Sequence, residues 1–317
     1  MENILPLHTS LKGMKKNLYK PYWEQRKKNL EKPIGKRLAV EKIIEITRQL
    51  KGEDNELEIL DIGCGEGDIL KCLSNSLKGN IRFTGLDKEE TVIRNAKKNT
   101  SNNTRKEHSF EFVTRTIEQE NWTNGMHKFD IIMAINTFHE IYTTLLYEKK
   151  EIAVKTKFTH ILTETFRLLK PNGLLLIFDG VESENALQRI INFHLTGQDI
   201  QNKLNIFEKE YLPIPVHFIK NGNRISCNYR DFTRFITKLN FIGSRTWEIE
   251  RKESYQYYTE KDFTELFLNN HMHILYKNSF IHNLSEWESK VYIDDPTVSY
   301  PFESFCIIGK NRYHGFE

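Results

Sequence analysis

The sequence predicts an α/β protein built on a mostly parallel sheet, and three observations lead to this prediction. Short apolar segments alternate with amphipathic, helix-like segments from residue 56 to residue 180. Several apolar segments, such as FDIIMAIN at 129–136, show no polar alternation, which is typical of strands buried on both faces. The first apolar segment leads directly into a glycine-rich turn and a helix-like pattern, which is the order of a βα unit.

Each element can be located from its own pattern. The helix at 88–99 begins with acids and ends with lysines, as the helix dipole favours. A turn at Pro171–Gly173 separates a helix from the fifth strand. We expect five strands at 56–62, 81–87, 110–113, 129–136 and 174–180, and helices at 14–50, 66–79, 88–99, 157–170 and 229–241. A sixth strand is predicted at 246–258 and a seventh at 303–311.

The regular alternation stops after residue 180, and this change suggests the domain organisation. Residues 1–50 are predicted to form an N-terminal helical arm or lid, and residues 51–317 a single large domain. Within that domain we expect a ligand-binding core at 56–180 and a lid or substrate insertion at 181–228. The insertion is expected to hold helices and irregular segments, and closing helices and strands follow at 229–317.

Composition excludes several classes of protein. The chain has a mean hydropathy of −0.57 and no run of 18 apolar residues, so we expect a soluble protein without a membrane span. The N-terminus lacks the apolar core of a signal peptide, and the four cysteines form no CxxC pair. These features favour a cytoplasmic protein. Monomer and homodimer are both left open.

The N-terminal region is basic. Residues 1–51 hold 13 Lys and Arg against five Glu, which could attract a nucleic acid or another anionic partner. The basic residues are interleaved with Leu, Ile and Trp, and this pattern favours a solvated face of amphipathic helices. Nucleic acid is therefore an unfavoured but open partner.

A bare glycine turn, Gly63–Gly67, follows the first strand in the sequence ILDIGCGEGDIL. Glycines let a backbone turn sharply and approach a ligand closely. Asp68 stands where a dinucleotide fingerprint requires its last glycine, and Glu66 and Asp68 would repel a pyrophosphate but suit a cationic ligand. No GK[ST] follows, which excludes a P-loop. Asp87, at the end of the second strand, either accepts hydrogen bonds from ribose hydroxyls or caps the next helix.

Four blocks together resemble a known family. LDIGCGEGDIL, FTGLDKEETVIRNAKKN, FDIIMAINTFHEI and LLKPNGLLLIFDG, in this order, resemble the class I S-adenosylmethionine-dependent methyltransferases. The resemblance covers about residues 56–180 and is weaker at 229–252 and 303–311. It implies a Rossmann-like, seven-stranded, mostly parallel sheet with helices on both faces and an antiparallel last strand. It also implies S-adenosylmethionine as cofactor, S-adenosylhomocysteine as product and methyl transfer as the activity.

The resemblance also implies which residues bind the cofactor. The methionine part would lie against Asp61, Gly63, Cys64, Gly65 and Gly67. The ribose would be held by Asp87, and the adenine would be flanked by Lys88 or Leu86 and touched at its edge by Thr116 and Ile117. The sulfonium would face Asn136 and Thr137. The sequence departs from the family at Arg115, where an acid is usual; the nearest acid is Glu118.

His139 is the candidate general base, because it follows the fourth strand at the edge where open α/β sheets bind their ligands. Glu140 beside it could orient the imidazole or act itself. A packing role for His139 is the alternative. His139 and Glu140 do not begin a zinc-binding HExxH motif, because position 143 is Thr143. His271 and His273 form an HxH pair that lacks a third ligand. We therefore expect no metal site.

The acceptor is expected to be a small molecule methylated on oxygen or nitrogen, since the long segments at 181–228 and 253–300 could enclose a pocket. Weaker substrate-contact candidates are Tyr22, Tyr142, His194 and Tyr255. The aromatic residues from Trp247 onward could line that pocket or form core. The alternatives are an RNA or peptide methyltransferase and a protein that binds S-adenosylmethionine without transferring methyl. A nicotinamide enzyme is disfavoured by the acids in the glycine turn.

Overall fold

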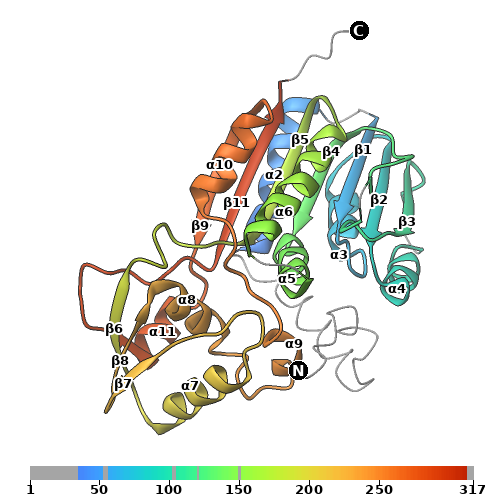
Figure 1. Ribbon diagram of the computed structural model, residues 1–317. Coiled ribbons are helices and arrows are strands. Elements are labelled where there is room, and N and C mark those ends of the chain that lie inside the picture. The colour runs from blue at the N-terminus through green and yellow to red at the C-terminus, as the bar shows by residue number, and fades with distance from the viewer. Residues whose placement is uncertain (1–34, 53–55, 102–104, 120, 149–150, 313–317) are drawn as a thin grey trace.

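The computed structural model describes residues 35–52, 56–101, 105–119, 121–148 and 151–312 (Figure 1). The predicted arm at 1–50 lies outside the described residues except for helix α2 (Lys36–Lys51). Tyr22 also lies outside them. None of the described helices is long and apolar enough to span a membrane.

The main sheet has seven strands, in the order β3-β2-β1-β4-β5-β11-β9. The strands are β1 (Leu57–Ile62), β2 (Ile81–Asp87), β3 (His108–Thr114), β4 (Phe129–Ile135), β5 (Leu169–Gly180), β9 (Met272–Phe280) and β11 (Ser304–Asn311). β1 to β5 are mutually parallel, and β11 lies between β5 and β9 and is antiparallel to both. The predicted Rossmann-like, mostly parallel fold is confirmed.

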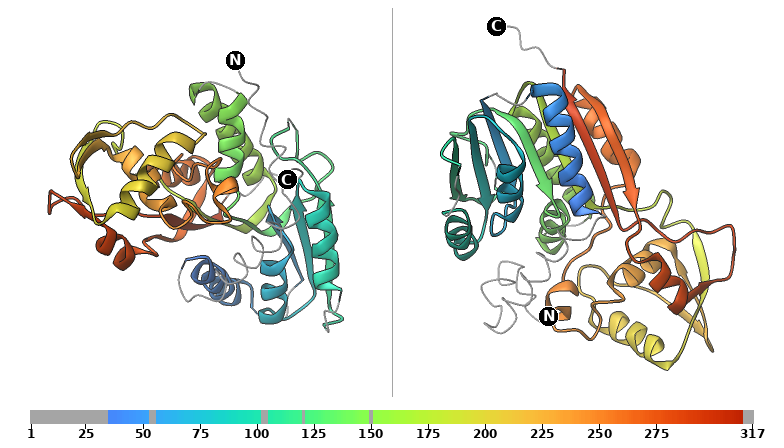
Figure 2. Two further views of the ribbon diagram at one scale, coloured as in Figure 1. Left: turned by 90° about the horizontal axis from the view of Figure 1, so that it is seen from below. Right: turned by 180° about the vertical axis from the view of Figure 1, so that it is seen from behind.

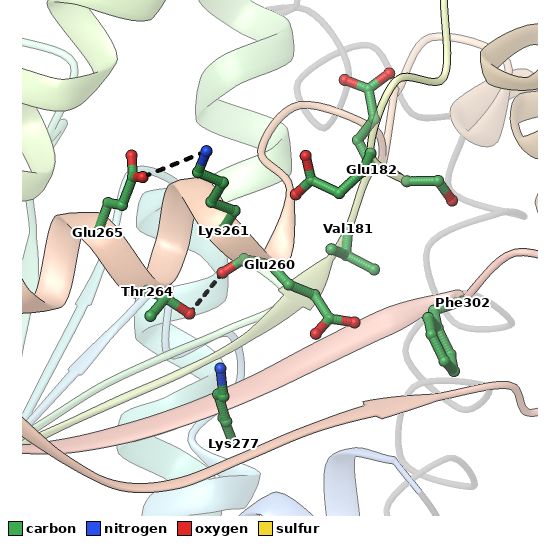
Figure 3. A pocket seen from close by; sticks show the side chains of 10 residues that line it. Val181, Glu182, Glu260, Lys261, Thr264, Glu265, Lys277 and Phe302 are labelled. Atoms are coloured by element: carbon green, nitrogen blue, oxygen red, sulfur yellow. Dashed lines mark hydrogen bonds and ion pairs between the residues drawn. The ribbon is translucent and has the colours of Figure 1, made fainter. Parts of the chain in front are cut away.

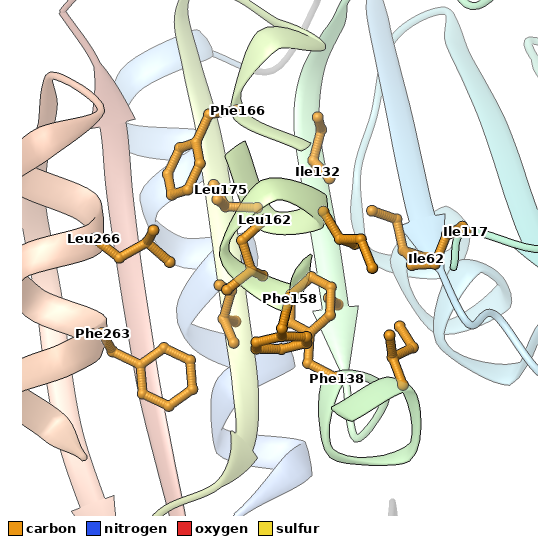
Figure 4. Packing of buried hydrophobic residues seen from close by; sticks show 14 of the residues in the cluster. Ile62, Ile117, Ile132, Phe138, Phe158, Leu162, Phe166, Leu175, Phe263 and Leu266 are labelled. Carbon is orange, nitrogen blue, oxygen red and sulfur yellow. The ribbon is translucent and has the colours of Figure 1, made fainter. Parts of the chain in front are cut away.

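Helices cover both faces of this sheet, and a hydrophobic core fills each interface. Helices α2, α3 (Asp68–Ser76) and α4 (Glu90–Thr100) pack on one face, and α5 (Phe138–Glu148), α6 (Glu151–Arg167) and α10 (Glu260–Asn269) on the other. Side chains alternate along β4, so that Met133 points into the first core and Ile132 into the second. Figure 4 shows the second core, where Phe158 of α6 packs between β4 and α10, and Figure 2 shows α2 on the opposite face.

A second lobe lies beyond the carboxyl ends of β4 and β5 (Figure 1). Its four-stranded antiparallel sheet has the order β10-β6-β8-β7, formed by β6 (Ile190–Leu195), β7 (Ile219–Asn221), β8 (Arg224–Asn228) and β10 (Val291–Ile293). The lobe also contains α7 (Gln198–Glu210), α8 (Tyr229–Lys238), α9 (Trp247–Glu250) and α11 (Leu284–Lys290). It has its own hydrophobic core, which Phe193 and Phe207 occupy without solvent exposure. The second lobe is thus formed by two separate segments of the chain, residues 186–250 and residues 281–300.

The structure differs from these predictions in four places. The sixth strand at 246–258 is wrong, because Trp247 and Ile249 form the short helix α9 and the following chain is a buried loop; β9, at 272–280, completes the sheet instead. Residues 181–228 contain three strands besides one helix. The chain after β4 forms α5, which the sequence analysis did not identify. Residues 229–250 pack in the second lobe, so residue 228 does not mark its end.

Candidate active site

The glycine turn between β1 and α3 has the backbone that its sequence indicates. Gly63, Gly65 and Gly67 all have positive φ, of 71°, 55° and 78°. A Cβ atom on Gly63 would lie 2.3 Å from Oγ1 of Thr137, so this glycine is required both by its backbone and by the close approach of the next loop. Thr137 in turn donates to the carbonyl of Ile62 at 3.0 Å. The ends of β1 and β4 are therefore joined directly under the site.

Asp61 is a buried carboxylate at the end of β1. Its side chain is 1% exposed, and neither carboxylate oxygen has a hydrogen-bond partner among the described residues. Burial raises the pKa of Asp61 to about 7, with Asp87 adding to the effect and Lys36 opposing it. Such a carboxylate suits a ligand that brings a positive charge and N–H donors.

Asp87 ends β2 and ties the glycine turn to it. Its carboxylate accepts hydrogen bonds from the backbone N–H of Gly65 at 3.1 Å and of Glu89 at 3.0 Å. Burial raises the pKa of Asp87 to about 6, against the opposing effect of these hydrogen bonds. The N-cap of α4 is Glu89, so the predicted capping alternative for Asp87 is not the arrangement found. Its remaining acceptor capacity faces a pocket.

This pocket, which we call the cofactor pocket, lies at the carboxyl edge of the main sheet. Its lining includes six residues predicted as site residues: Gly63, Asp87, Lys88, Ile117, Thr137 and Glu140. The other predicted residues of this edge are not among the lining residues: Asp61, Cys64, Gly65, Gly67, Thr116, Asn136 and His139. Asn136 adopts the left-handed backbone (φ 52°) directly before Thr137. Cys64 is buried and adjoins the turn, where burial raises its pKa well above the ordinary value.

Arg115, which stands where the family usually has an acid, stabilises a loop. Its guanidinium donates to the backbone carbonyls of Trp122 at 2.6 Å and Asn124 at 3.2 Å and so holds the loop after β3. Glu118 supplies the acid at this edge of the cofactor pocket, where its carboxylate lies 3.8 Å from Nζ of Lys88. Glu118, three residues after Arg115, thus places an acid at the cofactor pocket, although position 115 itself is not acidic.

Asp179, which the sequence analysis did not identify, organises the other half of the site. It ends β5 and is fully buried. Its Oδ2 accepts the backbone N–H groups of Thr137 at 3.1 Å, Phe138 at 2.7 Å and His139 at 3.2 Å, which are the first N–H groups of α5. Its Oδ1 accepts from Gly180 N at 2.7 Å and lies 2.5 Å from Nδ1 of His139. In the sequence, Asp179 could have been noticed as an acid near the end of a predicted buried strand, at the carboxyl edge of the sheet.

His139 lies in the first turn of α5, with its ring 3% exposed. Nδ1 faces Asp179, and Nε2 lies 3.8 Å from Oε2 of Glu253 in the loop after α9. The ring of Tyr255 packs edge-on against the imidazole at 4.7 Å, so this predicted substrate contact lies at the site. Burial disfavours the charged ring, but the charge and hydrogen bond of Asp179, with help from Glu253, raise the pKa of His139 to about 10. The ring therefore carries a positive charge between two carboxylates at neutral pH.

The other predicted contacts lie elsewhere. Tyr142 is buried in the core beneath α6, where it packs on Phe158 and Tyr257. His194 lies on β6 of the second lobe, with Nδ1 2.6 Å from Asp294. Most of the aromatic residues after 246 are core: Trp247, Tyr257, Tyr258, Phe263 and Phe267 are all buried.

A second cavity, of about 590 Å³, opens between β5, α10 and β9 (Figure 3). Its lining is rich in acids but shares no residue with the cofactor pocket. Glu182 is bound by Arg230 of α8 at 2.7 Å, and Lys261 lies 3.8 Å from Glu265. Two of the acids in this cavity are thus paired with cations, and none of the predicted site residues lines it.

Several solved structures are similar to this chain at low identity. The putative methyltransferase complexed with the Trm112 methyltransferase activator of Haloferax volcanii is 14% identical, with 94% of this chain and 97% of that chain covered and a TM-score of 0.46. An S-adenosylmethionine-dependent methyltransferase from Clostridium acetobutylicum is 11% identical, with 92% and 98% covered and a TM-score of 0.48. The putative methyltransferase BH2331 from Bacillus halodurans is 12% identical, with 85% and 99% covered and a TM-score of 0.44. No curated protein sequence matches the chain.

The seven-stranded sheet with its antiparallel β11, the glycine turn after β1 and the acid at the end of β2 together define an S-adenosylmethionine-dependent methyltransferase. The model of the Methyltransf_31 family, described as a methyltransferase domain, matches residues 53–212. The chain belongs to this family. S-adenosylmethionine is its cofactor.

Proposed function

We propose that the protein transfers the methyl group of S-adenosylmethionine to an oxygen or nitrogen atom of a small-molecule acceptor. The observation that supports this most is the enclosure of the site. His139, Glu253 and Ser254 are all buried where the loop after α9 crosses the carboxyl edge of the sheet. Ser254 is tied there by its backbone N–H, which donates to Oγ1 of Thr143 in α5 at 3.1 Å. An acceptor of limited size fits such a covered site better than a polymer does.

The residues around the cofactor pocket suit the parts of the cofactor. The unpartnered carboxylate of Asp61 suits the ammonium group of the methionine part, beside the backbone of Gly63, Cys64, Gly65 and Gly67. Asp87 has acceptor capacity left for the ribose hydroxyls, and Lys88, Thr116 and Ile117 would border the adenine. Asn136 and Thr137, between β4 and α5, would face the sulfur. When bound, the cofactor supplies a methyl group on a positively charged sulfur.

His139 and Glu140 are the proposed catalytic residues. An oxygen or nitrogen acceptor must shed a proton around the time of transfer, and Nε2 of His139, which faces away from Asp179, can accept it once the ring has lost its own proton, so methyl transfer should become faster as the pH rises above neutrality. Asp179 is a positioning residue, because it fixes both the ring and the first turn of α5. Glu140, in the next position, lines the cofactor pocket. We also propose that the second lobe, with Tyr255 at its border, covers the acceptor.

The test uses S-adenosylmethionine labelled in its methyl group. The purified protein is incubated with metabolite extracts below about 1 kDa, with total RNA and with a peptide mixture. We expect label in the small-molecule fraction only, and about 10²-fold or more slower labelling by His139→Gln with S-adenosylhomocysteine affinity unchanged. An Asp61→Asn variant is the matched control, since it should lose cofactor affinity.

Each contrary outcome points to a different reading. Label in RNA or peptide would overturn the small-molecule acceptor. Calorimetric binding of S-adenosylhomocysteine without any labelled product would favour a protein that binds the cofactor without transferring methyl. Unchanged turnover of His139→Gln would remove His139 from catalysis and leave the family intact.

A further inference from the structure

We propose that His139, Glu140 and Glu253 form a binding site for a divalent transition-metal cation at the mouth of the cofactor pocket. The inference rests on the proposed function and deepens it. With a cation bound, Nε2 of His139 is a ligand, and the cation, rather than a base, prepares the acceptor. No metal was expected from the sequence, because neither HE at 139–140 nor HxH at 271–273 completes a metal-binding motif, and Glu253 lies more than a hundred residues after His139.

The three side chains converge from two segments. His139 and Glu140 come from the first turn of α5, and Glu253 from the loop after α9. Their donor atoms, one from each residue, lie within 4.8 Å of one another, and Nε2 of His139 is 3.8 Å from Oε2 of Glu253. Ligands at about 2.1 Å from a metal are about 3 Å apart in an octahedral site. The donor atoms are farther apart than this, so the two glutamate side chains would have to turn toward the ring when a cation binds.

The orientation of the histidine is an independent observation. Nε2 is buried and has no hydrogen-bond partner among the described residues, although buried ring nitrogens normally have one. Nδ1 is bound to Asp179, which is itself held by four backbone N–H groups. A carboxylate behind the ring of a metal-binding histidine is the usual way of fixing its tautomer and orientation. Nε2 thus faces Glu253, and Glu140 completes the group of donor atoms.

The donor set indicates the kind of cation. One imidazole nitrogen and two carboxylates suit Mn²⁺, Fe²⁺ or Zn²⁺, whereas Mg²⁺ and Ca²⁺ prefer oxygen ligands throughout. The two glutamates balance the double charge, since His139 binds as the neutral ring. Water and the acceptor would complete the coordination. Mn²⁺ is the probe we choose, because it tolerates mixed nitrogen and oxygen ligands and is observable by electron paramagnetic resonance.

The position suggests what the cation does. Glu140 lines the cofactor pocket together with Thr137, so the cation would lie where the acceptor meets the methyl group. A cation lowers the pKa of a bound hydroxyl, whose proton then leaves to water. An oxygen–carbon bond forms as the sulfur–carbon bond breaks, and the sulfur keeps the electron pair as a neutral thioether. The acceptor class is accordingly a hydroxyl-bearing small molecule.

Binding is measured directly, without reference to activity. The protein is stripped with EDTA, dialysed and titrated with MnCl₂ by calorimetry and by electron paramagnetic resonance. We expect one Mn²⁺ per chain, with affinity at least tenfold weaker in Glu253→Gln and in Glu140→Gln. Glu265→Gln, in the acidic cavity beside α10, is the matched control and should bind as the wild type does. Circular dichroism and the thermal unfolding midpoint, measured on each variant, show that it is folded.

The outcomes separate this inference from the proposed function. Failure of the stripped, folded protein to bind Mn²⁺ or Zn²⁺ would overturn the metal site, and so would binding that the two glutamate variants leave unchanged. Methyl transfer that persists in EDTA would leave the proposed function standing without the metal. Tight, variant-sensitive Mn²⁺ binding, with labelled methyl transfer lost in EDTA and restored by MnCl₂, supports both.

Discussion

At the scale of single residues, this site is controlled by carboxylates with unequal surroundings. Asp179 is fully satisfied by backbone N–H groups and an imidazole, whereas Asp61 has no hydrogen-bond partner among the described residues. A satisfied buried carboxylate stabilises the structure around it, and an unsatisfied one costs free energy until a ligand supplies the missing charge. Asp179 therefore contributes to the stability of the fold. Asp61 lowers stability in the absence of ligand and contributes to ligand binding.

The substitution Asp61→Asn is predicted to increase stability without cofactor and to weaken cofactor binding. The pKa of Asp61 is raised from near 4 in an unfolded chain to about 7, so the folded state holds the proton more tightly. Its contribution to the free energy of unfolding is therefore present at low pH and is lost as the pH rises from about 4 to about 7. Without cofactor, the variant should melt a few degrees above the wild type at pH 8 and close to it at pH 4.5.

The same substitution should weaken S-adenosylhomocysteine binding about tenfold or more at pH 8, as measured by calorimetry. Because a charged Asp61 is needed to pair with an ammonium group, wild-type affinity should also fall between pH 7.5 and pH 5.5, and the variant should be less sensitive to this change. Equal affinity of variant and wild type at pH 8 would show that the cofactor does not use this carboxylate.

At the scale of elements, the helix that completes the second core begins with a capping box. In α10, Oγ1 of Thr259 accepts from the backbone N–H of Asp262 at 3.1 Å, and the Asp262 carboxylate accepts from the backbone N–H of Thr259 at 3.0 Å. Both bonds satisfy N–H groups that a helix start would otherwise leave unpaired. The hydrogen bonds from Thr259 and the ion pair with Lys155 hold the pKa of Asp262 below its ordinary value, despite burial.

Thr259→Ala should lower the free energy of unfolding by about 1 kcal/mol, since it removes one of these bonds. Urea denaturation would measure the change. Thr264→Ala is the matched control within the same helix: its hydroxyl bonds only to the carbonyl four residues earlier, so we expect a change of less than about 0.5 kcal/mol. An equal loss in both variants would mean that the cap has no special role.

How much the sequence could predict also depends on the kind of element. Most of the parallel strands were predicted because strands buried on both faces are largely apolar, and β4 is buried along its whole length; β3 alternates between buried and exposed residues instead. β7 is exposed along its whole length and β9 is mostly half-exposed, so neither shows such a run. The glycine turn is local in sequence and was predicted. The group around His139 joins three distant segments. Asp179 could have been noticed as an acid near the end of a predicted buried strand, but its pairing with His139 and the contribution of Glu253 could be assigned only in the folded chain.

At the scale of the whole molecule, the two lobes have separate cores but meet at the site. The second lobe packs around Phe207, which is fully buried among other aromatic rings. Arg230 of α8 is bound to Glu182 just after β5. The loop carrying Glu253 and Tyr255 leads from the second lobe back toward α10. Cofactor binding therefore depends on the main sheet, whereas the covering of the acceptor depends on both lobes.

The substitution Phe207→Ala tests whether cofactor binding depends on the main sheet alone. Truncating a buried phenylalanine costs about 3–5 kcal/mol, and here the loss falls on the second lobe. We expect faster hydrogen exchange in residues 186–242 and 284–300, near-normal affinity for S-adenosylhomocysteine and loss of most methyl transfer. Phe166→Ala, in the core between α6 and α10, is the comparison and should destabilise the main sheet instead. Loss of cofactor affinity in Phe207→Ala would show that the lobes are not separable.

The place of β11 has a consequence for how the chain is made. Among the described strands β9 pairs only with β11, and β11 alone joins β9 to β5. As the ribosome releases the chain, the strands of the second lobe and β9 have all emerged before residues 304–311 arrive. Until then β5 and β9 each present an open edge, which is where nascent chains aggregate. Pairing of residues 304–311 closes the edge of β5 and one edge of β9, so a chain that lacked these residues would yield a divided, exposed sheet rather than a shortened enzyme.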